Sequence, residues 1–158
     1  LELIGDYKKI VRKLHKSAIA RTEFGQLEEI LSIPPLQLMK SSDVRWNYVV
    51  DMFERALRVK PALSLLLAKH PTYPQLSIAD WDLMEATVDI LSPIKKATMF
   101  SQDRAMTAST IIPMVTIVLK EMAEKTEFAS ARKAICKKME EEQKKYTQNE
   151  FLILATAT

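Results

Sequence analysis

Basic side chains recur at helical spacing near the start of the chain and are the first residues suited to binding chemistry. They are Lys8, Lys9, Arg12, Lys13 and Lys16. The opposite helix face carries apolar side chains, namely Tyr7, Ile10, Val11 and Leu14. Cations along one helix can follow the phosphates of a nucleic acid, because each contact releases condensed counterions. Lys9, Arg12, Lys13 and Lys16 are therefore predicted to bind phosphate, with a solvated helix face as the alternative.

Metal-binding and nucleophilic chemistry have little support in the residue types and their spacing. Cys136 is the single cysteine, which excludes a disulfide framework and favours a reducing compartment. His15 and His70 have no cysteine or second histidine nearby, so we expect no zinc site and interpret His15 as a surface residue and His70 as a helix-end cation. The carboxylates are assigned to polar helix faces, and no nucleophile elbow is present. The sequence therefore predicts no catalytic residue and no metal ligand.

The composition favours a soluble helical protein of one domain. The chain has 158 residues, of which 47% are hydrophobic and 27% charged, and its net charge of +3 permits a polyanionic partner without requiring one. It contains only two glycines, whereas sheet proteins with many tight turns usually need more. No signal peptide is recognised, and the longest apolar run, near residues 111–119, is too short to span a bilayer.

Apolar spacing and turn residues place the helices of the first half. A helical pattern covers residues 6–31, either continuous or broken near 22–25, and the prolines after Ile33 end it. Ser41, Ser42 and Asp43 offer N-cap oxygens for a second helix that runs to about Val59. Its apolar stripe comprises Val49, Met52, Phe53, Ala56 and Leu57. Pro61 suits the first turn of a leucine-rich helix that ends near residues 70–71.

The second half continues with helical patterns. Ser77 and Asp80 resemble a capping box, and Pro93 either kinks the helix that follows or begins another. Residues 111–124 are apolar nearly all round at first, which predicts a central, buried helix. A charged helix follows, and its mixed lysines and glutamates at 137–145 predict exposed i,i+4 pairs. The short apolar run 151–154 is ambiguous between strand and helix. Four methionines are interpreted as core residues: Met99, Met106, Met114 and Met122.

Together these patterns predict an all-α fold, an irregular bundle of about six or seven helices that forms a single domain over residues 1–158. Several short motifs within it occur in a characteristic order. They are Arg45-Trp46-Asn47, Asp51-Met52, Glu54-Arg55, Leu76-Ser77, Trp81, Pro93, Ala97-Thr98, Ser101 and Thr107 through Ile112-Pro113, with Ser17 in the early basic helix. In this order the sequence resembles hAT-superfamily transposases and their zinc-finger BED relatives across most of residues 7–120. Val44, Tyr48 and Val49 depart from that pattern.

The resemblance implies that this chain is one region of a larger protein. Such transposases have an RNase H-like core with three metal-binding carboxylates, interrupted by a long helical insertion, and this chain resembles the beginning of that insertion. The catalytic acids are then expected upstream and downstream of these residues. This fragment would be non-catalytic and hold no cofactor, and a divalent metal such as magnesium would belong to the parent enzyme. The expected partners are DNA and further copies of the parent protein, with no membrane, and the expected location is nuclear.

Arg45 and Trp46 are the site residues that the resemblance implies. In the family, the corresponding tryptophan stacks on an unstacked base near the cleaved DNA end. Stacking of an aromatic side chain on a base is worth about 1–3 kcal/mol and tolerates any base, and an adjacent arginine can hold a phosphate. The alternative is that Trp46 packs in the core, since it falls near Val50 and Phe53 on the helical wheel.

Two functions from different classes follow from this reading. The first is a non-catalytic scaffold region of a hAT-type DNA transposase that contacts DNA near the cleavage site. The alternative is a helical protein-interaction or dimerisation module of a domesticated, transposase-derived transcription regulator. Whether the parent retains its three acidic residues distinguishes an enzyme from a domesticated protein.

Overall fold

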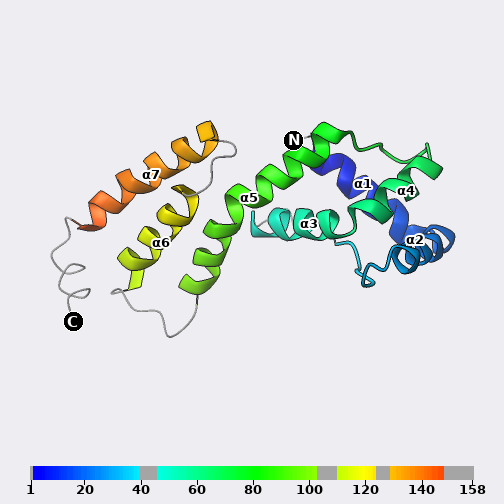
Figure 1. The fold of residues 1–158 in the computed structure, drawn as a ribbon, viewed down its shortest axis with the longest axis horizontal. Coiled ribbons are helices and arrows are strands. Elements are labelled where there is room, and N and C mark those ends of the chain that lie inside the picture. The colour runs from blue at the N-terminus through cyan, green and yellow to red at the C-terminus, as the bar shows by residue number, and fades with distance from the viewer. Residues whose placement is uncertain (1, 40–45, 103–109, 124–128, 148–158) are drawn as a thin grey trace. The chain divides into compact units, whose positions relative to one another are not determined.

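The fold consists of helices throughout the part of the chain that the computed structural model describes, which is residues 2–39, 46–102, 110–123 and 129–147 (Figure 1). The helices are α1 (Glu2–Lys16), α2 (Ala18–Ile30), α3 (Asn47–Arg58), α4 (Lys60–Lys69), α5 (Ile78–Ser101), α6 (Ile111–Ala123) and α7 (Ala129–Thr147). Within these ranges there are seven helices and no strand, which confirms the all-α prediction. The chain divides into two compact units, Leu1–Val88 and Asp89–Thr158. The single domain predicted for residues 1–158 stays a prediction.

The first unit is built around one apolar core. Each of α1 to α4 and the first turns of α5 contribute buried side chains, among them Tyr7, Ile10, Val11, Leu14, Phe24, Leu27, Met52, Phe53, Ala56, Leu63, Leu66, Trp81 and Met84. The predicted apolar face of α1 is confirmed, because all four of its apolar residues are buried. The apolar stripe of α3 is confirmed at its centre, while Val49 and Leu57 are only partly buried against the core.

The break in the first helical segment lies at Ser17, so the position near residues 22–25 was wrong. Ser17 adopts an extended backbone conformation, and its hydroxyl accepts a hydrogen bond from the backbone N–H of Ala20 at 3.2 Å. A serine in this role caps one of the free N–H groups at the start of α2. Helical spacing continues on both sides of Ser17, which is why periodicity alone misplaces the break.

Residues 33–39, which include the two prolines, run back along the first unit without regular secondary structure, and side chains of neighbouring helices hold them. The Glu28 carboxylate accepts from the backbone N–H of Leu36 at 3.1 Å. His15 Nε2 bonds the carbonyl of Leu38 at 3.1 Å, and Arg55 donates to the carbonyl of Gln37 at 3.0 Å. Three helices therefore fix the backbone of a segment that has no secondary structure of its own.

The helix boundaries around α4 and α5 agree with the turn residues in the sequence. Pro61 lies in the first turn of α4, and His70 is its C-cap, as predicted. The capping box is confirmed, since the Asp80 carboxylate accepts from the Ser77 backbone N–H at 2.8 Å and Ser77 Oγ accepts from the Asp80 N–H at 3.2 Å. α5 continues through Pro93 without a new helix. Ser41, Ser42 and Asp43 lie outside the described residues.

Replacing Ser77 by alanine is expected to lower the free energy of unfolding by about 1 kcal/mol at neutral pH, because the first turn of α5 loses its cap. Ser77 also lowers the pKa of Asp80 through hydrogen bonds to its carboxylate. A lowered pKa in the folded state stabilises above the unfolded pKa and is lost as pH falls through the folded value. The cost of Ser77→Ala should therefore shrink in acid. Urea denaturation at several pH values measures this, with Ser64→Ala on the exposed face of α4 as control.

The second unit contains the rest of α5 together with α6 and α7. The Arg132 side chain near the start of α7 is buried and pairs with Asp89 on α5, and Gln143 donates to the Thr116 hydroxyl on α6 at 3.1 Å. The prediction that α6 is central and buried was wrong. Only Val118 and Met122 of α6 are buried, and Ile117 is 63% exposed. α6 packs chiefly on α7, so much of its apolar surface is left uncovered by the described helices.

The other predictions for the second unit are confirmed in part. The exposed i,i+4 pairs predicted on α7 are confirmed by Lys138–Glu142 at 3.5 Å, and Lys145–Glu142 at 2.8 Å adds a pair at i,i+3 spacing. Among the methionines interpreted as core, Met122 is buried, whereas Met99 is exposed. Met106 and the run 151–154 lie outside the described residues. None of the described helices is both long and apolar enough to cross a bilayer.

Candidate nucleic-acid interface

The four α1 cations predicted to bind phosphate all lie on the exposed face of that helix. Lys9, Arg12, Lys13 and Lys16 are exposed, and the opposite face is buried in the core of the first unit. Lys8, beside them in the sequence, is half-buried. The amphipathic arrangement of α1 therefore brings these cations onto one side of the helix and leaves them accessible to solvent.

Two of these cations are engaged within the protein. Lys9 Nζ lies 2.8 Å from the Asp6 carboxylate one turn earlier. Lys13 Nζ donates to the backbone carbonyl of Thr72 and lies 5.2 Å from the centroid of the Tyr73 ring. A phosphate at either lysine would compete with these contacts. We therefore expect Lys9 and Lys13 to bind phosphate more weakly than their spacing on α1 suggests.

Arg12 and Lys16 remain as the accessible pair. Both are exposed, and neither has a hydrogen-bond or ion-pair partner among the described residues. They lie four residues apart, which places them about 6 Å apart along the helix axis on the same face of α1. The part of α1 best suited to an anion is therefore its C-terminal half.

Trp46 immediately precedes α3 and is 42% exposed. By contrast, Val50 and Phe53, further along the same face, are buried. Trp46 lies at the end of the apolar stripe and outside the buried core, which corrects its interpretation as a core residue. Trp46 also supplies no side-chain hydrogen bond to cap the helix. Arg45, the predicted phosphate contact beside it, lies outside the described residues.

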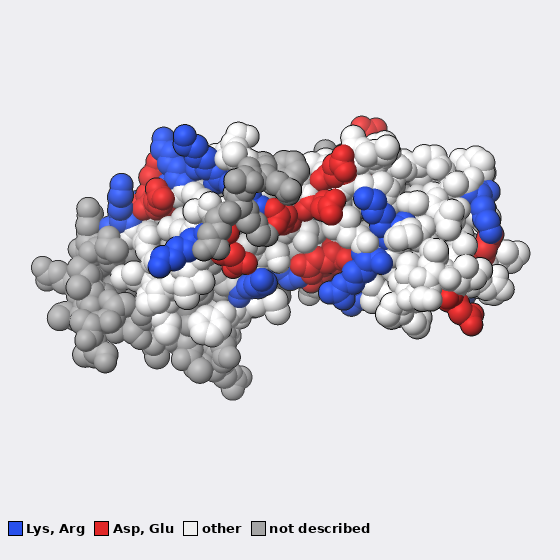
Figure 2. Space-filling model, in the orientation of Figure 1, with Lys and Arg blue, Asp and Glu red and all other residues white. Residues whose placement is uncertain are grey.

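Charges of both signs are interleaved on the face that Figure 2 shows, instead of forming one continuous basic surface. The densest group of lysines and arginines in that view lies over α7. On α7, Glu142 accepts hydrogen bonds from Lys145, and this contact lowers the pKa of its carboxyl. Exposed Lys133 and Lys137 in the first half of α7 have no such partner in the described part of the chain. They were not among the cations predicted to bind phosphate, because the sequence of the whole helix is typical of a solvated charged segment.

The two histidines have structural partners. His70 Nε2 lies 2.6 Å from the Glu23 carboxylate, and the hydrogen bonds from His70 and Lys69 lower the pKa of Glu23. His15 is half-buried and bonded to Leu38, so it is more than the surface residue expected. No three histidine, cysteine or carboxylate side chains among the described residues are close enough together to hold a metal ion. These contacts assign both histidines to the folding of the first unit.

Glu28 is a further residue whose burial differs from the prediction. It was assigned to a polar helix face, yet its side chain is 5% exposed. Burial raises the pKa of its carboxyl, and the hydrogen bond from Leu36 opposes that shift. The sequence of α2 contains no signal that Glu28 is buried. Its partner is the backbone N–H of Leu36, which residues 33–39 bring to the carboxylate.

Comparison with known proteins gives one distant relative for this chain. No family model matches the sequence, and no solved structure matches it. A curated human protein, zinc finger BED domain-containing protein 4, is 24% identical over 115 residues. The match covers 73% of this chain and 10% of that protein, so the chain spans about a tenth of the length of this relative. The chain is therefore distantly similar to a zinc finger BED domain-containing protein.

Proposed function

We propose that this chain is a non-catalytic helical region of a hAT-type, transposase-derived protein and that it contacts unpaired DNA through Trp46. The exposed position of Trp46 before α3 carries the proposal. The distant similarity to a zinc finger BED domain-containing protein and the all-helical fold support the family assignment. In this proposal the chain belongs to the helical insertion of an RNase H-like transposase.

The chemistry of such a contact follows from the surroundings of Trp46. A large aromatic face that is accessible to solvent can stack on an unpaired base of any identity. The start of a helix presents backbone N–H groups and the positive end of its dipole, which favour a phosphate. Arg12 and Lys16 would add electrostatic attraction that weakens with salt. Trp46 therefore supplies the contact with a base, and the cations of α1 supply a general attraction to phosphates.

Any metal-dependent cleavage belongs to other parts of the parent protein. The described residues contain no cluster of ligands that fits magnesium, so no metal-dependent step is assigned to them. A DNA-binding parent of this kind is proposed to act in the nucleus. The role of this chain is then to support the nuclease core and to present Trp46 toward the DNA.

The two tryptophans of the chain allow a direct test. Trp46 is exposed, whereas Trp81 is 5% exposed and lies under Lys60, whose Nζ is 5.6 Å from the ring centroid. In a Trp81→Phe variant, Trp46 is the single emitter, and a single-stranded oligothymidine should quench its fluorescence saturably. In a Trp46→Phe variant, the same titration should leave the emission of Trp81 unchanged. Equal quenching of both variants would contradict the proposal.

Replacing Trp46 by alanine is expected to weaken binding of the oligonucleotide by about 5- to 150-fold, which corresponds to a loss of about 1–3 kcal/mol of stacking. Its effect on the free energy of unfolding should stay below about 1 kcal/mol, because much of the side chain is already solvated. Fluorescence anisotropy of a labelled oligonucleotide and urea denaturation measure the two quantities. A large loss of stability with unchanged DNA affinity would contradict the proposal and would mean that Trp46 contributes to folding instead of DNA binding.

The second candidate function, a protein-interaction or dimerisation module, is favoured by the uncovered apolar surface of the second unit. A groove of about 530 Å³ lies between α5 and α6, and Phe100 and Ile117 on its walls are 56% and 63% exposed. Sedimentation equilibrium over a range of concentrations tests self-association of the chain. A dimer that Ile117→Glu dissociates supports this function, and a monomer at all concentrations contradicts self-association.

A further inference from the structure

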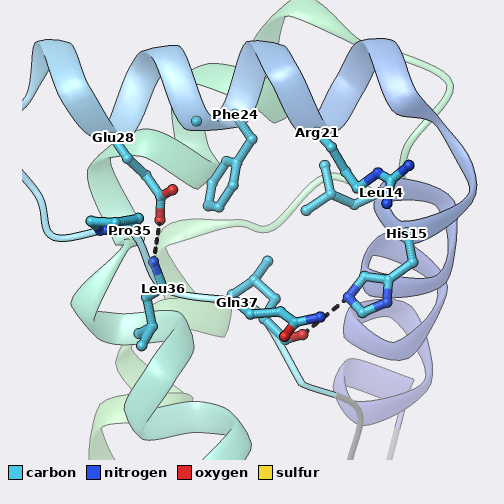
Figure 3. A pocket seen from close by; sticks show the side chains of 10 residues that line it. Leu14, His15, Arg21, Phe24, Glu28, Pro35, Leu36 and Gln37 are labelled. Atoms are coloured by element: carbon cyan, nitrogen blue, oxygen red, sulfur yellow. Dashed lines mark hydrogen bonds between the residues drawn. The ribbon is translucent and has the colours of Figure 1, made fainter.

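A second candidate site lies in the first unit, at a cavity of about 360 Å³ between α2, the end of α1 and residues 35–38 (Figure 3). Its volume falls within the range of sites that bind small molecules, about 300–1,000 Å³. Leu14, Phe24 and Leu36 give it apolar walls, and four polar side chains line it as well. Such a mixture of an apolar lining with a few polar groups is typical of a ligand site.

One wall of the cavity is a single face of α2. Arg21, Phe24 and Glu28 line it, and they are spaced by three and four residues, so they lie on successive turns. From Arg21 to Glu28 the helix rises about 10 Å. The wall therefore presents a cation at one end, an aromatic ring in the middle and a carboxylate at the other end, as Figure 3 shows.

The carboxylate of Glu28 has one oxygen to offer a ligand. Its Oε1 accepts from the Leu36 N–H at 3.1 Å, while Oε2 has no hydrogen-bond partner among the described residues. Figure 3 shows this second oxygen turned away from Leu36, on the side of Phe24. Oε2 therefore remains available to accept a hydrogen bond from a donor group that enters the cavity.

The other end of the cavity suits an anion. Arg21 is exposed, and its guanidinium has no ion-pair partner in the part of the chain that the structure describes. His15, close to it in Figure 3, already binds the carbonyl of Leu38. Guanidinium groups bind phosphates well, since their N–H groups match two phosphate oxygens at once.

We propose that this cavity binds a nucleotide whose base carries an exocyclic amine. The amine donates to Glu28 Oε2, the base lies against Phe24, and the phosphate pairs with Arg21. A nucleotide has its donor, flat ring and anion in the same order as these residues, whereas an amino acid carries both charges on one carbon and cannot reach across two helix turns. This site goes beyond the proposed DNA contact, because it uses neither Trp46 nor the exposed cations of α1.

Calorimetric titration of the 158-residue chain with mononucleotides tests the assignment. AMP, GMP and CMP carry an exocyclic amine, and at least one of them should bind saturably and at least 10-fold more tightly than UMP, which lacks one. Glu28→Gln keeps an acceptor for Leu36 but turns donors toward the ligand, so it should weaken that binding by about 10-fold or more. Arg21→Gln should weaken binding of the nucleotide and leave binding of its nucleoside unchanged.

Gly25 allows the cavity to be blocked without disturbing the core. Gly25 lines the cavity, and a Cβ added there would meet no atom within 4 Å. Gly25→Phe should therefore abolish nucleotide binding while the chain stays folded by circular dichroism. Gly5 on α1 has equally open surroundings and does not line the cavity, so Gly5→Phe should bind as the wild type does.

Four outcomes would overturn the proposal: no saturable binding of any amine-bearing nucleotide at millimolar concentration, equal affinity for UMP, equal affinity for inorganic phosphate alone, or unchanged binding by folded Gly25→Phe. The Trp46→Ala variant separates this site from the proposed DNA contact. It should lose affinity for the oligonucleotide and keep its affinity for the mononucleotide.

Discussion

Replacing Phe53 by alanine is expected to lower the free energy of unfolding of the first unit by about 3–5 kcal/mol. Phe53 is 2% exposed and lies in the centre of the core, where its ring meets Tyr7 edge to face with centroids 6.5 Å apart and planes at 86°. The truncation removes this contact and leaves a cavity among side chains that already pack closely. Urea denaturation followed by circular dichroism and by Trp81 fluorescence, in a Trp46→Phe background, measures the loss.

Two control variants define what this result means. Leu65 on α4 is exposed, so Leu65→Ala should change stability by less than about 1 kcal/mol. The Tyr7 hydroxyl is buried without a hydrogen-bond partner among the described residues, and this burial raises its pKa. Tyr7→Phe should therefore leave stability unchanged or raise it by about 1 kcal/mol. A loss below about 1 kcal/mol for Phe53→Ala would contradict the description of one core shared by α1 and α3.

The helices and their ends could be predicted from the sequence wherever local chemistry decides them. Ser77 and Asp80 form their capping box from residues three apart, and Pro61 fits the first turn of α4 through its fixed φ angle. The apolar face of α1 was predicted for the same reason, since a repeat of 3.6 residues needs no knowledge of its partner. Interactions within one or two turns carry this information.

Burial was harder to predict, because it depends on what covers a surface. The apolar sequence of α6 suggested a central helix, yet the described residues of its unit offer mainly α7 as a partner, and Ile117 stays exposed. Glu28 gave the opposite error. It is a charged residue on α2 that becomes buried, with Leu36 of the returning segment bonded to its carboxylate. Periodicity describes a face but does not identify its neighbour.

The candidate interface shows the same limit at single side chains. The helical wheel placed Trp46 with Val50 and Phe53, but a wheel has no axial coordinate and cannot tell that Trp46 precedes the first turn of α3. The cations of α1 were placed correctly on an exposed face, whereas the engagement of Lys13 by Thr72 and Tyr73 depends on a loop 59 residues away in sequence. Exposure and competition for a side chain are properties of the folded unit.

Glu28→Ala is expected to lower the free energy of unfolding by about 2–3 kcal/mol at neutral pH. The Leu36 N–H would lose its acceptor, and residues 33–39 would lose one of the side-chain contacts that hold them. Glu28→Gln keeps an acceptor of nearly the same shape and removes the buried charge, so it should be as stable as the wild type or more stable. Urea denaturation of the three proteins measures both differences, and equal losses for alanine and glutamine would contradict this account of the Leu36 contact.

The difference between wild type and Glu28→Gln should also depend on pH in a defined direction. Burial raises the pKa of Glu28 in the folded state, so folding favours its protonated form. Its contribution to stability is therefore fully present below the unfolded pKa and is lost as pH rises through the folded value. Other acids shift in the opposite sense, such as Glu23 with its lowered pKa, but they are common to both proteins and cancel in the difference. The advantage of Glu28→Gln over the wild type should grow from pH 4 to pH 7, and an advantage that shrinks over this range would mean that the carboxylate is stabilised, not penalised, by its position under Leu36.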